Sequence, residues 1–241
     1  MAKAKRQAEY AAASPVPTKA MLSVFDLDRT LTILPTYTPF LLFAIRTRAP
    51  WRILLLPLLL PVAILYALRL VPRRTMKQAM HRAALGQRLA ERDAARLADR
   101  FARRLVAHGL YAEGLALIEA ERAAGRRVVI ATAAPHFYTA ALARRLGIAD
   151  VIATDSTWRD GCLTPAIGSA NCYGGDKRHR VAAFLDRAGI ARDRAHIRFY
   201  SDHVSDLPMF GFADEAIAVN PSAKLRGVAE ARGWPILDWR R

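Results

Sequence analysis

Five short, mostly apolar runs, separated by helical stretches, constrain most strongly what this chain of 241 residues can fold into. Such runs are typical of strands that helices bury on both faces. Between them, helices are expected over about 135–146 and 176–188. Strands that alternate with helices predict an α/β fold with a doubly wound, Rossmann-like, mostly parallel sheet. The five runs are Met21–Phe25, Arg127–Thr132, Val151–Ala153, His196–Tyr200 and Glu215–Val219.

A long stretch with helical periodicity separates the first strand from the second and predicts a mostly helical cap inserted after the first strand. Within the core, a turn at Asp160-Gly161 predicts a small β-excursion over 155–168. The first residues predict a flexible basic arm that ends in a Pro-rich turn. The expected division is an arm over 1–19, a core over 20–32 and 121–241, and a cap over 33–120.

Polar residues stand where several of these strands end. In an open α/β sheet the active site lies at the carboxyl ends of the strands, so these side chains are expected in one place. Two carboxylates follow the first strand, and a threonine ends the second. A lysine near the start of a helix and two carboxylates after the fourth strand complete the set. The residues are Asp26, Asp28, Thr132, Lys177, Asp202 and Asp206.

Each of these residues alone has a structural alternative. Asp28 could cap a turn or a helix, and Asp206 could begin the following helix. Lys177 lies in the charge run KRHR, which is typical of a solvated helix face. Their order along the chain, at successive strand and helix ends, favours one common site.

Phosphoryl transfer to a carboxylate needs this set of groups. One aspartate attacks phosphorus and forms an aspartyl-phosphate, and a second protonates the leaving oxygen and then activates water. Neighbouring carboxylates repel one another unless a divalent cation lies among them, and oxygen ligands suit Mg²⁺. A lysine and a hydroxyl hold the phosphoryl oxygens, where charge must be stabilised.

The segment FDLDRTLT, with the later threonine, lysine and DxxxD element, resembles the four motifs of the haloacid dehalogenase superfamily of phosphohydrolases, over roughly 22–220. A cap between the first and second motifs is similar to the phosphoserine-phosphatase-like branch. Arg29 departs from the pattern, because the family most often has glycine there. His136 follows the second motif and is expected either at the mouth of the site or in a structural position.

The resemblance implies a role for each residue. Asp26 would be the nucleophile and Asp28 the general acid and base. Thr132, Ala133 and Lys177 would bind the phosphoryl group, and Mg²⁺ would be the cofactor. The implied metal ligands are Asp26, the main-chain carbonyl of Asp28 and Asp202, with Asp206 supporting them.

The segment Ile53–Leu68 is the most apolar part of the chain, with 16 uncharged residues of which eight are leucine. Pro57 and Pro61 would kink a helix there. A single membrane crossing would separate Asp26 from the later motifs. Ile53–Leu68 would therefore lie in the interface, re-enter on the same side, or pair with the run at 38–45 as a hairpin. The predicted membrane-associating segment of the cap is 38–71. The alternatives are a core helix of the cap and a dimer interface.

The chain is strongly basic, with 37 Lys and Arg against 21 Asp and Glu, a formal charge of +16. Such an excess suits nucleic acid, an anionic membrane surface or a phosphorylated substrate. No nucleic-acid partner is expected, because the arginines are dispersed and aromatic residues make up only 8%. Arginines flank the apolar segment on both sides, and no secretory signal is visible. The expected location is the cytoplasmic side of the inner (plasma) membrane.

Together these features predict a Mg²⁺-dependent phosphomonoester hydrolase that acts through an aspartyl-phosphate. The layout resembles the phosphatidylglycerophosphatase C group, which implies a phospholipid head group as substrate. One alternative is a soluble phosphatase for a small molecule such as phosphoserine or histidinol phosphate. Another is a membrane-bound, non-catalytic regulatory protein with the same fold, against which the intact set of acidic residues argues.

Overall fold

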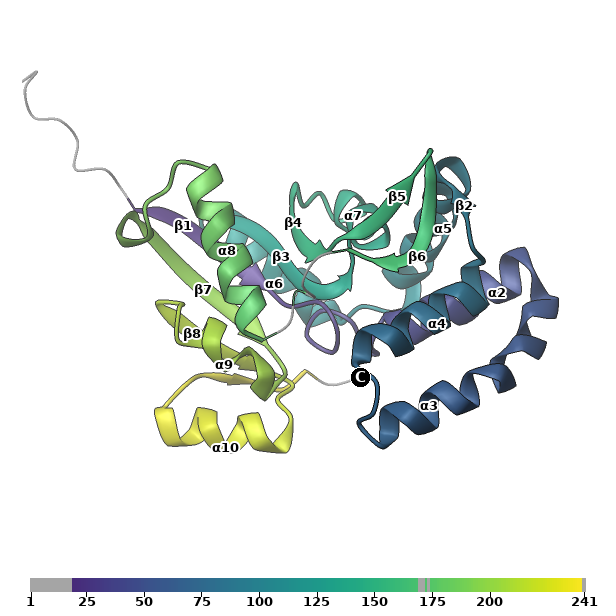
Figure 1. Ribbon diagram of the computed structural model, residues 1–241. Helices are drawn as coiled ribbons and strands as arrows, with labels where there is room; N and C mark the ends of the chain where they lie inside the picture. The colour runs from purple at the N-terminus through teal and green to yellow at the C-terminus, as the bar shows by residue number, and fades with distance from the viewer. Residues whose placement is uncertain (1–18, 169–171, 173, 240–241) are drawn as a thin grey trace, which may run out of the picture.

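The core of the protein is a six-stranded parallel sheet with the order β4-β3-β1-β7-β8-β9 (Figure 1). The computed structural model describes residues 19–168, 172 and 174–239, so the predicted arm lies almost wholly outside the described residues. All five predicted strands are present, and the two-residue β9 is an addition. The strands are β1 (Ala20–Phe25), β3 (Arg127–Pro135), β4 (Asp150–Thr154), β7 (Ala195–Ser201), β8 (Glu215–Val219) and β9 (Ile236–Leu237).

Helices cover both faces of this sheet, which confirms the doubly wound α/β fold. One face packs against α6 and α7 through Ile118 and Leu142, and the other against α8 and α10 through Val181 and Leu225. Adjacent side chains on a strand point to opposite sides of the sheet, so a continuous apolar run supplies apolar side chains to both faces. The helices of the core are α6 (Ala112–Ala123), α7 (His136–Arg145), α8 (Gly175–Arg187), α9 (Leu207–Phe210) and α10 (Ala223–Arg232), with short 3₁₀ turns η2 (Arg192–Arg194) and η3 (Val204–Asp206).

The cap lies between β1 and α6 and is mostly helical, as predicted. Its aromatic centre joins it to the core, because Phe40 of the cap stacks on Tyr138 of α7 with ring centroids 4.6 Å apart. Phe101 packs edge-on against Phe40 in the same cluster. The elements are α2 (Tyr37–Arg48), η1 (Pro50–Leu59), α3 (Leu60–Ala67), α4 (Arg73–Leu85), β2 (Leu89–Ala90) and α5 (Glu91–His108).

The boundary between cap and core differs from the expected one in two places. The predicted β-excursion forms β5 (Ser156–Arg159) and β6 (Cys162–Ile167), but β6 pairs with β2 in a three-stranded sheet of the cap. The buried pair Leu89 and Leu163 joins these two strands. Conversely, most of α6 falls within 33–120, the range predicted for the cap, but the helix belongs to the core. Its Glu121 accepts a hydrogen bond from the hydroxyl of Tyr200 on β7.

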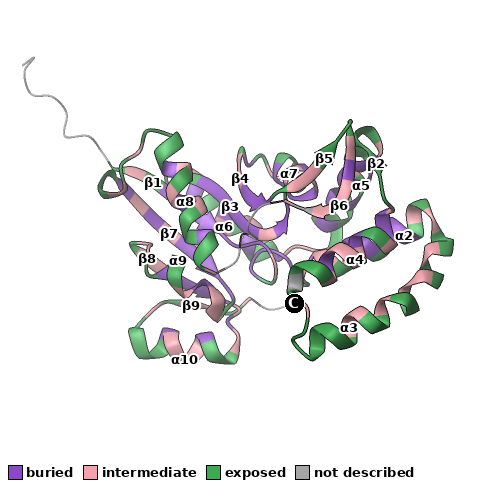
Figure 2. Ribbon diagram, in the orientation of Figure 1, coloured by how far each residue is buried: buried purple, intermediate pink, exposed green. Residues whose placement is uncertain are grey.

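The apolar segment lies on the surface, where η1 and α3 run beside α4 at the edge of the cap (Figure 2). Pro57 lies inside η1 and has no backbone N–H to donate, and the amide of Leu60 bonds to the carbonyl of Pro57, three residues back, as in a 3₁₀ helix. Pro61 lies in the first turn of α3, where proline is tolerated. No residue of η1 or α3 is buried, and the exposed fractions of Leu54 and Leu58 are 74% and 70%. By length and composition alone, Pro50–Ala67 could span a membrane, with a mean hydropathy of 1.8. The core-helix alternative is therefore wrong.

The predicted membrane-associating segment 38–71 is divided by the structure. Its first part forms α2, whose apolar residues Phe40, Leu41, Ala44 and Ile45 are buried in the core cluster. These side chains are unavailable to a lipid phase, so the run at 38–45 is not half of an inserted hairpin. Within 38–71, the exposed large apolar side chains lie on η1, α3 and the turn after them, apart from Leu42 of α2.

Candidate active site

The first catalytic candidate lies at the carboxyl end of the central strand. Phe25, the last residue of β1, is in register with Ile130 of β3 and Tyr200 of β7. The next residue, Asp26, remains attached to the sheet, because its amide donates a 2.9 Å hydrogen bond to the carbonyl of Tyr200. The side chain of Asp26 is therefore fixed at the point where three parallel strands end.

A pocket of about 230 Å³ at this edge contains every site residue that the sequence predicted. The acidic groups come from the β1 loop and from the segment after β7, and the lysine comes from α8. The fold thus brings together side chains that are far apart in the chain. The predicted residues that line the pocket are Asp26, Asp28, Thr132, Ala133, Lys177, Asp202 and Asp206.

Lys177 is held between two carboxylates. Its Nζ lies 2.7 Å from Oδ1 of Asp26 and 2.6 Å from Oδ2 of Asp206. The same Asp206 oxygen accepts a 2.7 Å hydrogen bond from the hydroxyl of Ser201. The lysine is 2% exposed, so its ammonium group is fixed by these contacts rather than by solvent. Asp206 consequently positions Lys177 beside Asp26.

Asp28 is anchored by a residue that sequence analysis missed. The amide and the hydroxyl of Thr36 both donate to Oδ1 of Asp28, each at 2.7 Å. The Thr36 hydroxyl also lies 3.1 Å from the hydroxyl of Tyr138. Because Oδ1 is engaged twice, Oδ2 is the oxygen suited to carry and release a proton. No sequence motif marks Thr36, because it reaches Asp28 only when the loop after β1 folds back.

Burial dominates the ionisation of the carboxyl groups. It raises the pKa of Asp26 to about 8, although Lys177 opposes the shift, and raises the pKa of Asp202 to about 7. Burial also raises the pKa of Asp28, against the hydrogen bonds from Thr36. Burial disfavours the charge on Lys177, but Asp26 and Asp206 outweigh it and hold the lysine pKa above its usual value. A cation among these carboxyl groups would favour their ionised forms.

The donor set fits Mg²⁺, which prefers oxygen ligands and usually takes one or two carboxylates with water and substrate oxygens. Asp26 and Asp202 offer carboxylates in one pocket, and the resemblance implies the main-chain carbonyl of Asp28 as the third ligand. Among the described residues no three acidic, histidine or cysteine side chains form a ready metal cluster. Two carboxylates with one carbonyl are compatible with that finding. The predicted ligand set remains a prediction.

Thr132 and Ala133 form the wall contributed by β3. The Thr132 hydroxyl oxygen accepts a 3.1 Å hydrogen bond from the amide of Ala134, which fixes the side chain. The carbonyl of Ala133 accepts from the hydroxyl of Thr154 at 3.0 Å, which ties this wall to the end of β4. The hydroxyl of Thr132 is thereby oriented within the pocket.

Arg29 also lines the pocket, with Pro35, His203 and Ser205, none of which was a predicted site residue. Its φ is 62°, in the left-handed region that glycine adopts at least cost. This backbone conformation explains why glycine is favoured at the position of Arg29 in the motif. The guanidinium of Arg29 lowers the pKa of Asp202, but burial raises it by more.

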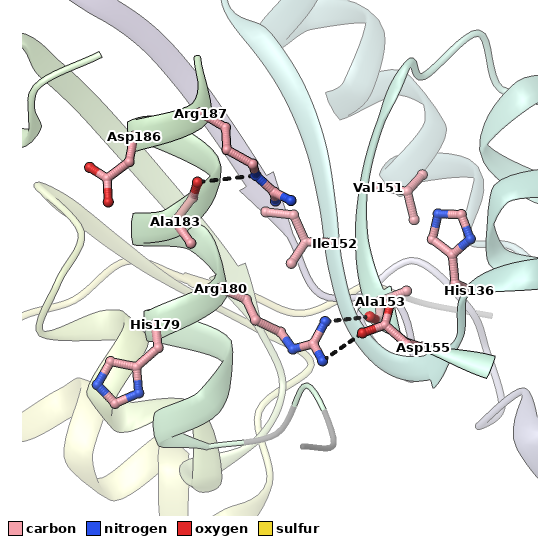
Figure 3. Close-up of a pocket in the computed structure, with 10 residues that line it drawn as sticks. All are labelled: His136, Val151, Ile152, Ala153, Asp155, His179, Arg180, Ala183, Asp186 and Arg187. Atoms are coloured by element: carbon pink, nitrogen blue, oxygen red, sulfur yellow. Dashed lines mark hydrogen bonds and ion pairs between the residues drawn. The ribbon is translucent and has the colours of Figure 1, made fainter. Parts of the chain in front are cut away.

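His136 lines a different and larger groove, of about 780 Å³, between α8 and β4 (Figure 3). There Arg180 reaches from α8 to the carbonyl of Ala153 at 3.1 Å and to Asp155 at 3.0 Å. Arg180 lies on the helix that carries Lys177, so these contacts secure α8 against the end of β4. No predicted site residue lines this groove.

Replacing Thr36 tests its role as the anchor of Asp28. Thr36→Val removes one of the two hydrogen bonds to Oδ1 and is expected to lower kcat by about 3- to 10-fold, the usual net value of one hydrogen bond. Thr36→Ser should restore activity because it keeps the hydroxyl. Thr47→Val removes a hydroxyl that bonds only within α2 and serves as the control in the same steady-state assay. An unchanged kcat for Thr36→Val would contradict the assignment.

Comparison with known proteins places this geometry in a family. The model of the haloacid dehalogenase-like hydrolases matches residues 23–211. A crystal structure of a protein of unknown function from Bordetella pertussis Tohama I superposes with a TM-score of 0.81 and 30% identity, covering 92% of this chain and 99% of that one. A structure of phosphoserine phosphatase with a phospho-aspartyl intermediate analogue has a TM-score of 0.60 and 16% identity over 92% of this chain and 95% of that one, which shows the shared fold.

Two curated relatives share part of their sequence with this chain. A phosphoserine phosphatase of Mycobacterium tuberculosis is 37% identical over 117 residues, 48% of this chain and 37% of that protein. A histidinol-phosphatase of Neisseria meningitidis is 28% identical over 126 residues, 52% of this chain and 57% of that protein. The matches thus cover little more than a third of the first relative and over half of the second. With the family model matched across both core and cap, this chain belongs to the haloacid dehalogenase-like hydrolases.

Proposed function

We propose that this protein is a Mg²⁺-dependent phosphomonoester hydrolase that acts through an aspartyl-phosphate, on a phospholipid head group at the cytoplasmic face of the membrane. The observation that carries the chemistry is the buried contact of Lys177 with Asp26 and Asp206, beside the anchored Asp28, in one pocket. The observation that carries the substrate class is the exposed apolar surface of the cap.

The pocket supplies each step of a two-stage transfer. Asp26 attacks phosphorus while Lys177 and Thr132 hold the phosphoryl oxygens, and Asp28 gives its proton to the departing alcohol oxygen. Asp28 then accepts a proton from the water that hydrolyses the aspartyl-phosphate. Bound Mg²⁺ would neutralise charge on the phosphoryl oxygens, held by Asp26, Asp202 and the carbonyl of Asp28.

The apolar surface of η1 and α3 supports a lipid-facing cap. It contains ten exposed apolar side chains in a short stretch, and exposed arginines stand on both sides of it. Apolar burial and attraction of arginine to anionic lipid reinforce one another at a membrane surface. The apolar residues are Trp51, Ile53, Leu54, Leu58, Leu60, Ile64, Leu65, Tyr66, Leu68 and Leu70, and the arginines are Arg46, Arg48, Arg69 and Arg74.

Attachment in the plane of the interface agrees with the position of the site. Asp26 precedes the apolar surface in the chain and Asp202 follows it, yet both line the same pocket. Both flanks therefore stay on one side of the bilayer. The alternative is a dimer that buries this surface between two copies of the chain. The flanking arginines of the two copies would then repel one another, which favours an anionic membrane.

Phosphate release from a substrate panel tests the proposal. The panel contains phosphatidylglycerol phosphate in anionic vesicles, phosphoserine and histidinol phosphate, each assayed with Mg²⁺ and with excess EDTA. The vesicle substrate is expected to have the highest kcat/KM, and EDTA should abolish release. Preference for phosphoserine or histidinol phosphate would support the soluble alternative suggested by the relatives' names. No release from any substrate would favour the regulatory alternative.

Asp202→Ala tests the metal ligand set in the same assay. Removing this carboxylate is expected to raise the Mg²⁺ concentration needed for half-maximal activity at least about tenfold, since even residues that only support metal ligands are worth 10- to 100-fold in affinity. The control is Asp186→Asn, an exposed aspartate on α8. Full activity of the wild type in EDTA would overturn the metal-dependent mechanism.

A further inference from the structure

A groove of about 400 Å³ lies on the cap, between α4 and the segment formed by η1 and α3 (Figure 1). We call it the cap groove. One wall comes from η1 and α3, through Leu55, Leu59 and Val62, and the other from the small side chains Ala79 and Ala83 of α4. Its volume falls within the range of about 300–1,000 Å³ that is typical of ligand sites. Among the residues that the structure describes, none lines both this groove and the catalytic pocket, so the two are separate.

Two arginines line the cap groove where η1 begins and α4 ends. Nη1 of Arg52 donates to the carbonyl of Ala83 at 3.3 Å and to that of Arg82 at 3.4 Å, so this guanidinium lies against the last turn of α4. Gly86 allows the approach, because a Cβ there would lie 2.8 Å from Nη2 of Arg52. These contacts engage only Nη1, and an arginine carries five N–H donors. Arg52 is therefore held in place with further donors for a ligand.

The positive charge at this end of the groove is not balanced from within it. None of the described residues that line the groove is acidic. In the part of the chain that the structure describes, neither Arg52 nor Arg82 forms an ion pair with a carboxylate. Gln87, which lies beside Arg82, is neutral. Two neighbouring guanidinium groups suit a phosphate group, which accepts several charge-assisted hydrogen bonds at once.

The remainder of the cap groove is apolar and continues into the exposed apolar surface of η1 and α3. Leu58 belongs to both, because it lines the groove and is largely exposed. An exposed apolar surface of this kind indicates an interaction site. A hydrocarbon chain fits the groove, since it needs no hydrogen-bond partner and its burial removes apolar surface from water. A free phosphate ion would leave the apolar walls uncovered.

We propose that the cap groove binds one anionic phospholipid, whose phosphodiester contacts Arg52 and Arg82 and whose acyl chain lies between α4 and the η1–α3 segment. This lipid is a partner of the cap and not the molecule that is cleaved, because the groove and the catalytic pocket are separate. The inference rests on the proposed membrane attachment for the source of the lipid, but not on the identity of the substrate. It makes attachment selective, since apolar insertion alone does not distinguish head groups, whereas two arginines favour an anionic one.

The test measures binding of dihexanoyl-phosphatidylmethanol below its micelle concentration, a lipid with two chains, a phosphodiester and no other charge. Calorimetry gives Kd. The fluorescence of Trp51, which lines the groove, should shift to the blue on binding, and Trp51→Phe should remove that shift. Arg52→Met and Arg82→Met are each expected to raise Kd about 10- to 100-fold, the usual value of a hydrogen bond to a charged group. Dihexanoyl-phosphatidylcholine and dimethyl phosphate should bind more weakly, because the first brings a cation to the arginines and the second has no long chains.

A charge-neutral variant separates the groove from general attraction of anions. Ala79→Leu fills the groove and is expected to raise Kd about tenfold, since displacing even two methylene groups of the chain has that effect. The matched controls are Arg48→Met and Ala67→Leu, which make the same kinds of change at exposed positions that do not line the groove. Melting temperature and hydrolysis of 4-nitrophenyl phosphate report the fold and the catalytic pocket, and Arg82→Met and Ala79→Leu should leave both unchanged.

Equal binding of the two lipids, or a Kd that neither Arg82→Met nor Ala79→Leu changes, would overturn the lipid site. A wild type that binds no lipid but forms a dimer that Ala79→Leu dissociates would assign the groove to a second copy of the chain, which also overturns it. Selective lipid binding by a protein that cleaves only soluble phosphomonoesters would refute the lipid substrate while the groove site stands. Cleavage of the vesicle substrate without binding of the short-chain lipid would do the reverse.

Discussion

Asp26→Asn is expected to reduce phosphate release by roughly 10⁴-fold or more, the scale found when a covalent nucleophile is removed from an enzyme. The amide cannot attack phosphorus, so the aspartyl-phosphate does not form. The change is nearly isosteric, and the amide oxygen of the new side chain can still accept from Lys177, which lies 2.7 Å from Oδ1 of Asp26. The loss should therefore appear in kcat and leave the fold intact.

Two measurements separate this outcome from simple damage to the pocket. The variant should fail to form an acid-stable trapped phosphoryl adduct or a fluoride–metal adduct, whereas Asp186→Asn should behave as the wild type in both. Asp28→Asn should also be severely impaired, through loss of proton transfer. If Asp26→Asn kept most of its turnover while Asp28→Asn lost it, the two aspartates would have exchanged roles.

Polar substitution of the apolar surface should release the protein from membranes. In the triple variant Leu54→Gln, Leu58→Gln, Leu60→Gln, three side chains with exposed fractions of 61–74% lose their apolar character. Burying a leucine is worth roughly 1.5–3 kcal/mol, so the partition coefficient between anionic vesicles and buffer should fall by about 10³-fold or more. These leucines pack against nothing in the core, so unfolding should be nearly unchanged.

The matched control is Val106→Gln, an exposed apolar residue on α5 outside this surface. Vesicle sedimentation measures the partitioning, and high salt should release little of the wild type because apolar insertion is not screened. The triple variant should keep its activity on 4-nitrophenyl phosphate while losing activity on lipid in vesicles. A wild type that stays in buffer without vesicle binding, and is dimeric, would assign the surface to a subunit interface.

The sequence predicts the sheet and the catalytic pocket well because both follow from strand ends. Parallel strands share one carboxyl edge, so Asp26, Thr132 and Asp202 meet wherever the strands pair. Thr36 could not be predicted, because it matters only through tertiary contacts that no local pattern records. The apolar run of α2 was assigned to the membrane-facing segment because composition cannot distinguish burial against Phe101 from burial in lipid.

The place of the β5–β6 hairpin was missed for a related reason. Its turn is visible at Asp160 and Gly161, whose φ angles are 47° and 66°. Its partner β2 has only two residues, too few for a periodic signal. The sequence therefore shows the hairpin itself but does not predict its pairing with a strand as short as β2.

The chain connects the cap to the core at two places, which we call necks: one at the segments that enter and leave the helical part of the cap, and one at the β5–β6 hairpin. At the first neck the two connecting segments are joined by hydrogen bonds, from Ile33 to Gly109 at 2.9 Å and from Tyr111 to Leu31 at 3.0 Å. At the second, Gly168 donates to the carbonyl of Asp155 at 3.2 Å. A body tethered at two separated points keeps one easy rotation, about the line through both. We therefore expect any opening of the cap for substrate entry and product exit to follow that axis, and stiffening either connection to slow both steps together.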